Sequence, residues 1–254
     1  MNKSLKVAEI VPLRFLNMTS KNMYHMCLAH LVLKSEEYAL FYRRMSDEGK
    51  YVLVDNGACE GEKMSYDDLM RVYDIIRPTE IILPDVLFDK EETLERTYFF
   101  LDNYNLRRYK KMVVPQGQDL DQWKECCDEM LVIDEVNTIG IPKWLGGAYI
   151  GSRPAICEKL TNTDKEIHLL GCSEGPKVLL DCKRKNPNVR GCDSAFAYLC
   201  AKAGVKVIDS ETKRPGEKID FLNDTKGSET LDKLMADFEI AAGAYNNLFE
   251  EGWM

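Results

Sequence analysis

The stretch that decides the fold is Tyr51–Asp85, YVLVDNGACEGEKMSYDDLMRVYDIIRPTEIILPD. Near its two ends, Tyr51–Val54 and Ile81–Leu83 are short apolar runs of the kind that form buried parallel strands. Between them, Ser65 opens a stripe of apolar residues at helical spacing, and this stripe stops before Pro78. The stretch therefore predicts a strand, a helix and a second strand parallel to the first.

The same alternation extends in both directions along the chain. We expect strands at Val7–Val11, Tyr51–Val54, Ile81–Leu83, Met112–Val114, Asn137–Ile141, Ile167–Leu170, Val189–Cys192 and Val205–Ile208. Eight strands in 254 residues leave about 32 residues for each strand–helix unit, which is close to what a (β/α)8 barrel requires. The sequence therefore predicts an α/β chain with a TIM-type (β/α)8 barrel. A doubly wound open sheet is the alternative, and its nucleotide-binding versions are weakened because no G-x-G-x-x-G or P-loop motif follows any strand.

Composition and length favour one domain over residues 1–254, with no linker or internal repeat. Helix starts are predicted at Ser65 and Asp89, and a C-terminal helix begins near Leu231. The polar stretch 210–229 predicts a mobile loop. No uncharged apolar run is long enough to span a bilayer, and nine scattered cysteines without a C-x-x-C favour reduced thiols. These features predict a soluble, cytoplasmic protein that does not bind a membrane.

Polar residues follow the predicted strands at the point where each strand ends. Asp55 and Asp193 stand directly after two of these strands, and Asp85 and Gln116 each follow another strand after one proline. The carboxyl ends of parallel barrel strands lie on one face, where active sites are built. Helix capping does not explain Asp55, which precedes the cap at Ser65 by ten residues, and Ser194 can cap in place of Asp193. The pattern predicts three carboxylates and an amide in one site.

Six short blocks in the same order make the chain resemble the tRNA-guanine transglycosylase superfamily, roughly from Tyr51 to Val207. The blocks are V-D-N-G at Val54–Gly57, I-L-P-D at Ile82–Asp85, V-P-Q-G at Val114–Gly117, I-G-I-P at Ile139–Pro142, H-L-L-G at His168–Gly171 and G-C-D-S-A-F-A-Y at Gly191–Tyr198. The resemblance implies an enzyme that exchanges a guanine base in a polynucleotide through a covalent glycosyl-enzyme intermediate.

The resemblance also implies a role for each matching position. Asp193 is the expected nucleophile, and Asp55 is the expected general acid and base. The expected base-binding residues are Asp85 and Gln116 at the purine edge, the backbone of Gly140 and Ile141, Leu170 against the base face, and Asn56 and Gly57 beside Asp55. Cys59 stands where the family usually has a stacking aromatic residue. Trp144 is compatible with loop packing or with base stacking.

Two departures narrow the expected substrate. The family's structural zinc motif is missing, since no histidine follows His168 and the later cysteines lack metal spacing, so we expect no metal and no cofactor. We also expect no appended RNA-binding domain after the barrel. The chain in this respect is similar to short phage-type members that insert 7-deazaguanines such as preQ0 into DNA, which would place it in the host cytoplasm. Expected partners are DNA and the free 7-deazaguanine base, with a homo-oligomer or partner protein left open.

The net charge of −8 means that a nucleic acid must be held by a local basic patch. We expect this patch near the pocket mouth, from Lys183, Arg184, Lys185, Arg190, Lys213 and Arg214. Three alternatives stay open: base exchange in tRNA rather than DNA, a non-catalytic transglycosylase subunit, and an unrelated barrel glycosidase.

Overall fold

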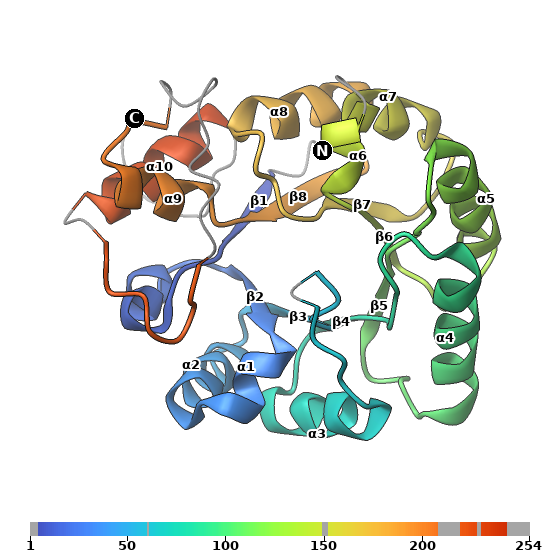
Figure 1. The fold of residues 1–254 in the computed structure, drawn as a ribbon, viewed down its shortest axis with the longest axis horizontal. Coiled ribbons are helices and arrows are strands. Elements are labelled where there is room, and N and C mark those ends of the chain that lie inside the picture. Colours follow the sequence, from blue (N-terminus) through green and yellow to red (C-terminus); the bar gives the residue numbers. More distant parts are fainter. Residues whose placement is uncertain (1–4, 60, 149–151, 208–218, 228–229, 243–254) are drawn as a thin grey trace.

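The fold is a ring of eight parallel strands, seen in a computed structural model that describes residues 5–59, 61–148, 152–207, 219–227 and 230–242. The strands are β1 Lys6–Glu9, β2 Tyr24–Leu28, β3 Tyr51–Asp55, β4 Glu80–Ile82, β5 Lys110–Val113, β6 Thr138–Ile141, β7 Glu166–Leu169 and β8 Val189–Ser194. Their order is β1-β8-β7-β6-β5-β4-β3-β2, and β1 and β2 meet to complete a nearly closed ring (Figure 1). The predicted (β/α)8 TIM-type barrel is confirmed.

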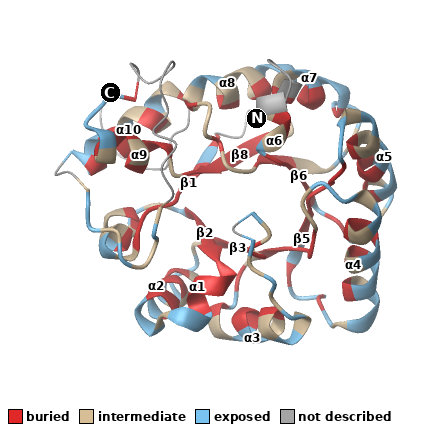
Figure 2. Ribbon diagram, in the orientation of Figure 1, coloured by how far each residue is buried: buried red, intermediate tan, exposed pale blue. Residues whose placement is uncertain are grey.

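Helices surround the ring and bury it on its outer side (Figure 2). They are the 3-10 helix η1 Leu13–Thr19 and the α-helices α1 Ala29–Lys34, α2 Glu36–Asp47, α3 Tyr66–Ile76, α4 Lys90–Asn103, α5 Leu120–Leu131, α6 Trp144–Ala148, α7 Ser152–Lys159, α8 Pro176–Lys185, α9 Phe196–Ala203 and α10 Leu231–Ala241. In the described part of the chain, none of them has both the length and the hydropathy needed to cross a bilayer.

Helix starts follow the capping signals in the sequence. The Ser65 hydroxyl accepts a hydrogen bond from the Asp68 amide at 3.1 Å at the start of α3. The Asp89 carboxylate accepts one from the Glu92 amide at 3.0 Å at the start of α4. Each cap satisfies a backbone N–H that has no partner inside its helix, so both helices begin where the local sequence predicts.

One strand of the ring was not predicted, and one predicted strand is wrong. β2, Tyr24–Leu28, carries the sequence YHMCL, which has no β-branched residue and includes a histidine, yet all five residues are buried. The prediction placed the eighth strand at Val205–Ile208 instead. Val205 is exposed, and its amide donates to the Cys200 carbonyl at 3.0 Å, so it closes α9 rather than pairing in the sheet. Ile208 lies outside the described residues.

The amino-terminal half of the barrel interior is filled by a buried ionic network around Arg190. Its guanidinium pairs with the Glu80 carboxylate, which is fully buried, and donates to the Thr138 hydroxyl at 3.1 Å. It also lies over the Tyr24 and Tyr51 rings, 5.7 and 5.6 Å from their centroids. The interior at this end of the barrel is therefore occupied by paired side chains, as is usual for barrels of this type.

Part of the predicted mobile loop is held against the barrel. The Phe221 carbonyl accepts from the Leu13 amide at 2.8 Å, and the Lys226 carbonyl accepts from the Tyr198 hydroxyl at 2.8 Å. Lys202 pairs with Asp224 at 2.7 Å. These contacts fix residues 219–227, while 210–218 and 228–229 lie outside the described residues. All nine cysteines are free thiols, and eight of them are buried.

Candidate active site

Four predicted polar residues lie at the carboxyl ends of the strands. Asp55 is the last residue of β3, Asp193 is the fifth residue of β8, and Asp85 and Gln116 follow β4 and β5 within three residues. Because all the strands are parallel, these ends lie at one end of the barrel, as predicted. Asp193 is the centre of one hydrogen-bonded group, Asp85 is the centre of another that includes Gln116, and Asp55 accepts from the Gly57 amide in its own loop.

The Asp193 carboxylate is buried and held by two donors. The Gly171 amide donates to both of its oxygens, at 3.1 Å to Oδ1 and 3.0 Å to Oδ2. His168 Nε2 lies 3.2 Å from Oδ1, and Asp193 is only 5% exposed. Oδ1 therefore has two partners and Oδ2 one. The less occupied Oδ2 is the oxygen better placed to attack an electrophile.

His168 links Asp193 to Tyr24 across the barrel interior. The Tyr24 hydroxyl lies 3.2 Å from His168 Nδ1, and His168 is fully buried. Burial lowers the pKa of His168, more strongly than the hydrogen bond to Asp193 raises it, so the ring is neutral at neutral pH. A carboxylate only accepts, so Nε2 carries the proton and donates to Asp193, and Nδ1 accepts from the Tyr24 hydroxyl. In the sequence His168 stands out only as the first residue of the H-L-L-G block, and nothing local points to Tyr24.

Gly171 is needed for both its backbone conformation and its lack of a side chain. Its φ is +56°, in the left-handed region that glycine adopts without strain. A Cβ there would lie 3.3 Å from Cδ of Lys143, whose stem passes over this glycine. The left-handed turn directs the Gly171 amide at Asp193, and it brings Lys143 to the edge of the site.

Asp85 is the centre of the second group. Its two carboxylate oxygens accept from Asn56 Nδ2 and from Gln116 Nε2, each at 2.6 Å. Burial raises the pKa of Asp85 to about 6, and the two hydrogen bonds oppose that rise. Asp85 therefore changes its charge near pH 6 while held between two amides.

Trp144 and Phe88 extend this group towards the outside. Trp144 Nε1 donates to Gln116 Oε1 at 3.1 Å, and the Phe88 amide lies 3.4 Å from the same oxygen. The two aromatic rings lie 5.5 Å apart. Trp144 thus belongs to the site, since it fixes the Gln116 amide through the indole N–H. Phe88 carried no sequence signal.

The remaining predicted base-binding residues lie beside these groups. A Cβ on Gly140 would lie 3.1 Å from Cδ1 of Leu170, so Leu170 covers this glycine. The Ile141 side chain is buried in the core, and its carbonyl accepts from the Leu170 amide at 3.0 Å. The Gly57 amide donates to Asp55 Oδ2 at 3.1 Å, which ties Asp55 to its own loop.

The structure does not place the predicted basic patch near Asp193. Helix α8 runs from the end of β7 back to the start of β8, so its last turn lies at the amino-terminal end of the barrel, away from the carboxylates. There Lys183 donates to the Pro187 and Val189 carbonyls at 2.8 Å each. The other two basic residues of this turn, Arg184 and Lys185, pair with acidic side chains of the helices at 3.3 and 3.1 Å.

Arg190 is also corrected, because its guanidinium lies inside the barrel on Glu80 and is 5% exposed. Arg190 is close to Asp193 in sequence, but β8 carries the chain from one end of the barrel to the other, so Arg190 does not lie at the pocket mouth. Lys213 and Arg214 lie outside the described residues.

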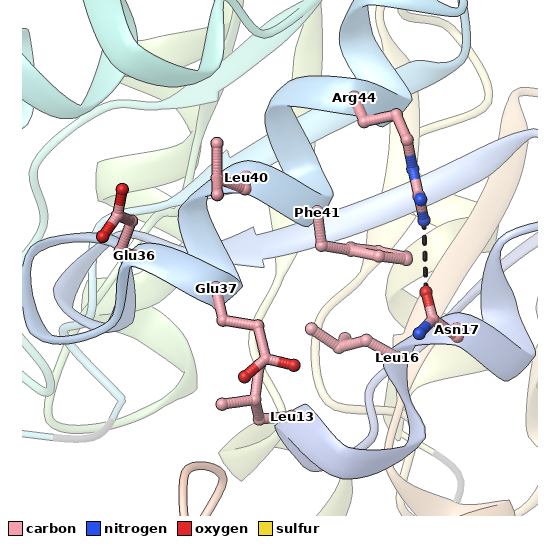
Figure 3. Close-up of a pocket in the computed structure, with 8 residues that line it drawn as sticks. All are labelled: Leu13, Leu16, Asn17, Glu36, Glu37, Leu40, Phe41 and Arg44. Atoms are coloured by element: carbon pink, nitrogen blue, oxygen red, sulfur yellow. Dashed lines mark hydrogen bonds between the residues drawn. The ribbon is translucent and has the colours of Figure 1, made fainter.

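Neither a metal centre nor an outer groove adds to these strand-end groups in the described part of the chain. Within the described ranges, no group of three or more His, Cys, Asp or Glu side chains is arranged to hold a metal ion. A groove of about 610 Å³ lies between η1 and α2 and is lined by residues such as Glu37, Leu40 and Arg44 (Figure 3). Its lining residues come only from these two helices outside the ring, so it is separate from the strand-end groups.

Fold and site together define a TIM-type barrel with a carboxylate and amide centre at the carboxyl ends of its strands. No protein-family model matches the chain, and no curated protein matches it either. The barrel is similar to a mutant tryptophan synthase α-subunit from Pyrococcus furiosus, with 11% identity, a TM-score of 0.53, and coverage of 96% of this chain and 100% of that one.

The N-acetylneuraminate lyase of Mycoplasma synoviae is similar as well, with 14% identity, a TM-score of 0.51, and coverage of 82% of this chain and 74% of that one. At such low identity these similarities establish the fold alone.

Proposed function

We propose that the protein is an enzyme that exchanges a guanine base in a polynucleotide for a 7-deazaguanine. The observation that carries this proposal is the Asp193 carboxylate, held by the Gly171 amide and neutral His168 at the carboxyl end of the barrel. A carboxylate fixed in this way, without a neighbouring cation in bonding range among the described side chains, is suited to form a covalent bond to a sugar carbon.

In the first step, Asp193 Oδ2 attacks C1′ of the nucleoside as the C1′–N9 bond breaks. The departing guanine takes the bonding electron pair and receives a proton from Asp55. The ester that forms keeps Oδ1 as its carbonyl oxygen, which the Gly171 amide and His168 Nε2 polarise. In the second step, N9 of the incoming base attacks C1′ and loses its proton to Asp55, and Asp193 leaves as a carboxylate.

Base recognition is assigned to the Asp85 group. A guanine or 7-deazaguanine edge presents N–H donors, and the Asp85 carboxylate is an acceptor buried between two amides. Leu170 and Gly140 offer an apolar surface next to it. A purine that lacks the matching donors would cover Asp85 without adding hydrogen bonds to its remaining lone pairs, and this gives the site its selectivity.

The target nucleotide must be extruded from a duplex or come from a single strand, because both carboxylate groups lie at the inner end of the barrel mouth. We propose DNA as the polynucleotide, with tRNA as the alternative. This choice rests on the resemblance to the short phage-type transglycosylases.

The test is incorporation of labelled guanine, and of a labelled 7-deazaguanine, into DNA and tRNA by the wild type and by Asp193→Asn. We expect exchange by the wild type, and none by the variant, which cannot form the glycosyl ester. Asp102→Asn, an exposed position on α4, is the matched control and should exchange normally. Exchange by Asp193→Asn at the wild-type rate contradicts the assignment. Release of a free base without incorporation of the new one identifies a hydrolase instead.

A further inference from the structure

Phe88 has two properties that core packing does not explain. Its side chain is 47% exposed, and its φ of +62° lies in the left-handed region that a large side chain adopts only under strain. The loop is nevertheless fixed, since Thr93 Oγ1 bonds to both the amide and the carbonyl of Val86, at 2.9 and 3.1 Å. An exposed aromatic ring is therefore held in place at a cost in backbone strain.

The surroundings of Phe88 connect it to the base-binding group. Its ring packs on Trp144, which donates to Gln116, and Gln116 donates to Asp85. Asp85 and Gln116 are 8% and 1% exposed, so they lie deeper than the half-exposed Phe88. Phe88 is thus at the rim of the site whose inner end holds the purine edge.

Phe88 also lines a groove of about 270 Å³ between the starts of α4 and α5. The amide side chains of Gln118 and Gln122 line the same groove. Three carboxylates also line it, against one lysine, Lys90, which is bonded to Glu125 at 2.9 Å and to Glu91 at 3.1 Å. This charge balance repels a phosphate, and an aromatic ring beside two amides suits a neutral, flat group with a polar edge.

We propose that Phe88, supported by Trp144, is a stacking site for the nucleobase that adjoins the extruded target in the polynucleotide strand. The proposal rests on the proposed function, since it requires a nucleic acid substrate. Extrusion of one nucleotide leaves its neighbour without a stacking partner, and an aromatic ring at the rim replaces the lost contact. Gln118 and Gln122 meet the edge of that neighbouring base.

The experiment measures binding of single-stranded oligonucleotides, as DNA and as RNA of the same sequence, to the wild type, Phe88→Leu and Phe88→Asn. Leucine keeps an apolar side chain without the ring, and asparagine removes the ring while tolerating the left-handed backbone. We expect both variants to bind the preferred strand about 10-fold more weakly. Binding of free guanine should fall clearly less than binding of the strand, because the purine edge contacts Asp85 and not the Phe88 ring. Phe99→Leu is the matched control, since Phe99 is 46% exposed and stacks on Tyr66 outside the barrel.

A strand with an abasic site beside the target guanine gives a second readout. The wild type should bind this strand about 10-fold more weakly than the intact strand. The Phe88 variants should bind the two strands equally well. Equal binding of the intact strand by the wild type and both Phe88 variants overturns the proposal, and so does an equal loss with Phe99→Leu. Failure of the proposed function looks different, because the wild type would then exchange no base in either nucleic acid.

Discussion

Replacing Asp85 by asparagine should make the protein more stable at alkaline pH and less stable at acid pH. Burial raises the pKa of Asp85 from 3.8 to about 6, so the folded protein binds more protons than the unfolded chain between these values. The stability that this carboxyl contributes is complete below its unfolded pKa and is lost as the pH rises through 6. A difference of two pKa units corresponds to about 3 kcal/mol above that range.

Asparagine does not ionise, so the variant keeps its stability as the pH rises through 6. It loses one hydrogen bond, however, and this costs less. Asn56 and Gln116 both donate to Asp85, and an amide has only one oxygen to accept them. One lost hydrogen bond costs about 1 kcal/mol. The variant should therefore be more stable than the wild type by about 2 kcal/mol near pH 8, about equally stable near pH 4.5, and less stable by about 1 kcal/mol at about pH 3. It should also lose purine binding, because the buried acceptor becomes partly a donor.

Urea unfolding followed by circular dichroism across this pH range measures the effect. Asp102→Asn, at an exposed position, controls for the removal of a negative charge from the protein. A difference between Asp85→Asn and the wild type that stays constant from acid to alkaline pH would refute the reasoning, because the raised pKa requires a change of sign.

Three further substitutions test the contacts of His168, Arg190 and Gly140. His168→Leu removes the donor to Asp193 and should lower the base-exchange rate about 10- to 100-fold. His168→Gln keeps a donor and should recover part of that rate, so equal rates in the two variants count against a positioning role. Arg190→Met removes the cation paired with the buried Glu80 and should lower the free energy of unfolding in urea by about 3–5 kcal/mol. Adding Glu80→Leu should recover most of that stability, and a single Arg190→Met substitution without effect contradicts the network. Gly140→Ala places a Cβ about 3 Å from three side chains and should destabilise the fold by about 1–3 kcal/mol, with weaker purine binding measured by calorimetry; unchanged stability and binding show that the site has spare room.

The sequence by itself determined the barrel and the residues at its carboxyl end. Apolar runs and capped helices alternate at a nearly constant spacing, and helix starts such as Ser65 and Asp89 depend on contacts with residues only three positions away. Parallel strands then bring all their carboxyl ends to one side of the barrel, so the sequence alone places Asp55, Asp85 and Asp193 on that side. These features are encoded locally, or follow from a rule that holds for all parallel barrels.

Only the tertiary structure decided how those residues are held and which others join them. β2 has weak local propensity and forms because barrel closure buries it on both faces. The contact between Tyr24 and His168 joins residues 144 positions apart, and Arg190 is drawn into the barrel by Glu80, 110 positions away. Such pairings, like the raised pKa of Asp85, depend on burial and on distances across the ring. A one-dimensional pattern does not contain them, because burial and cross-barrel distances are fixed only when the ring closes.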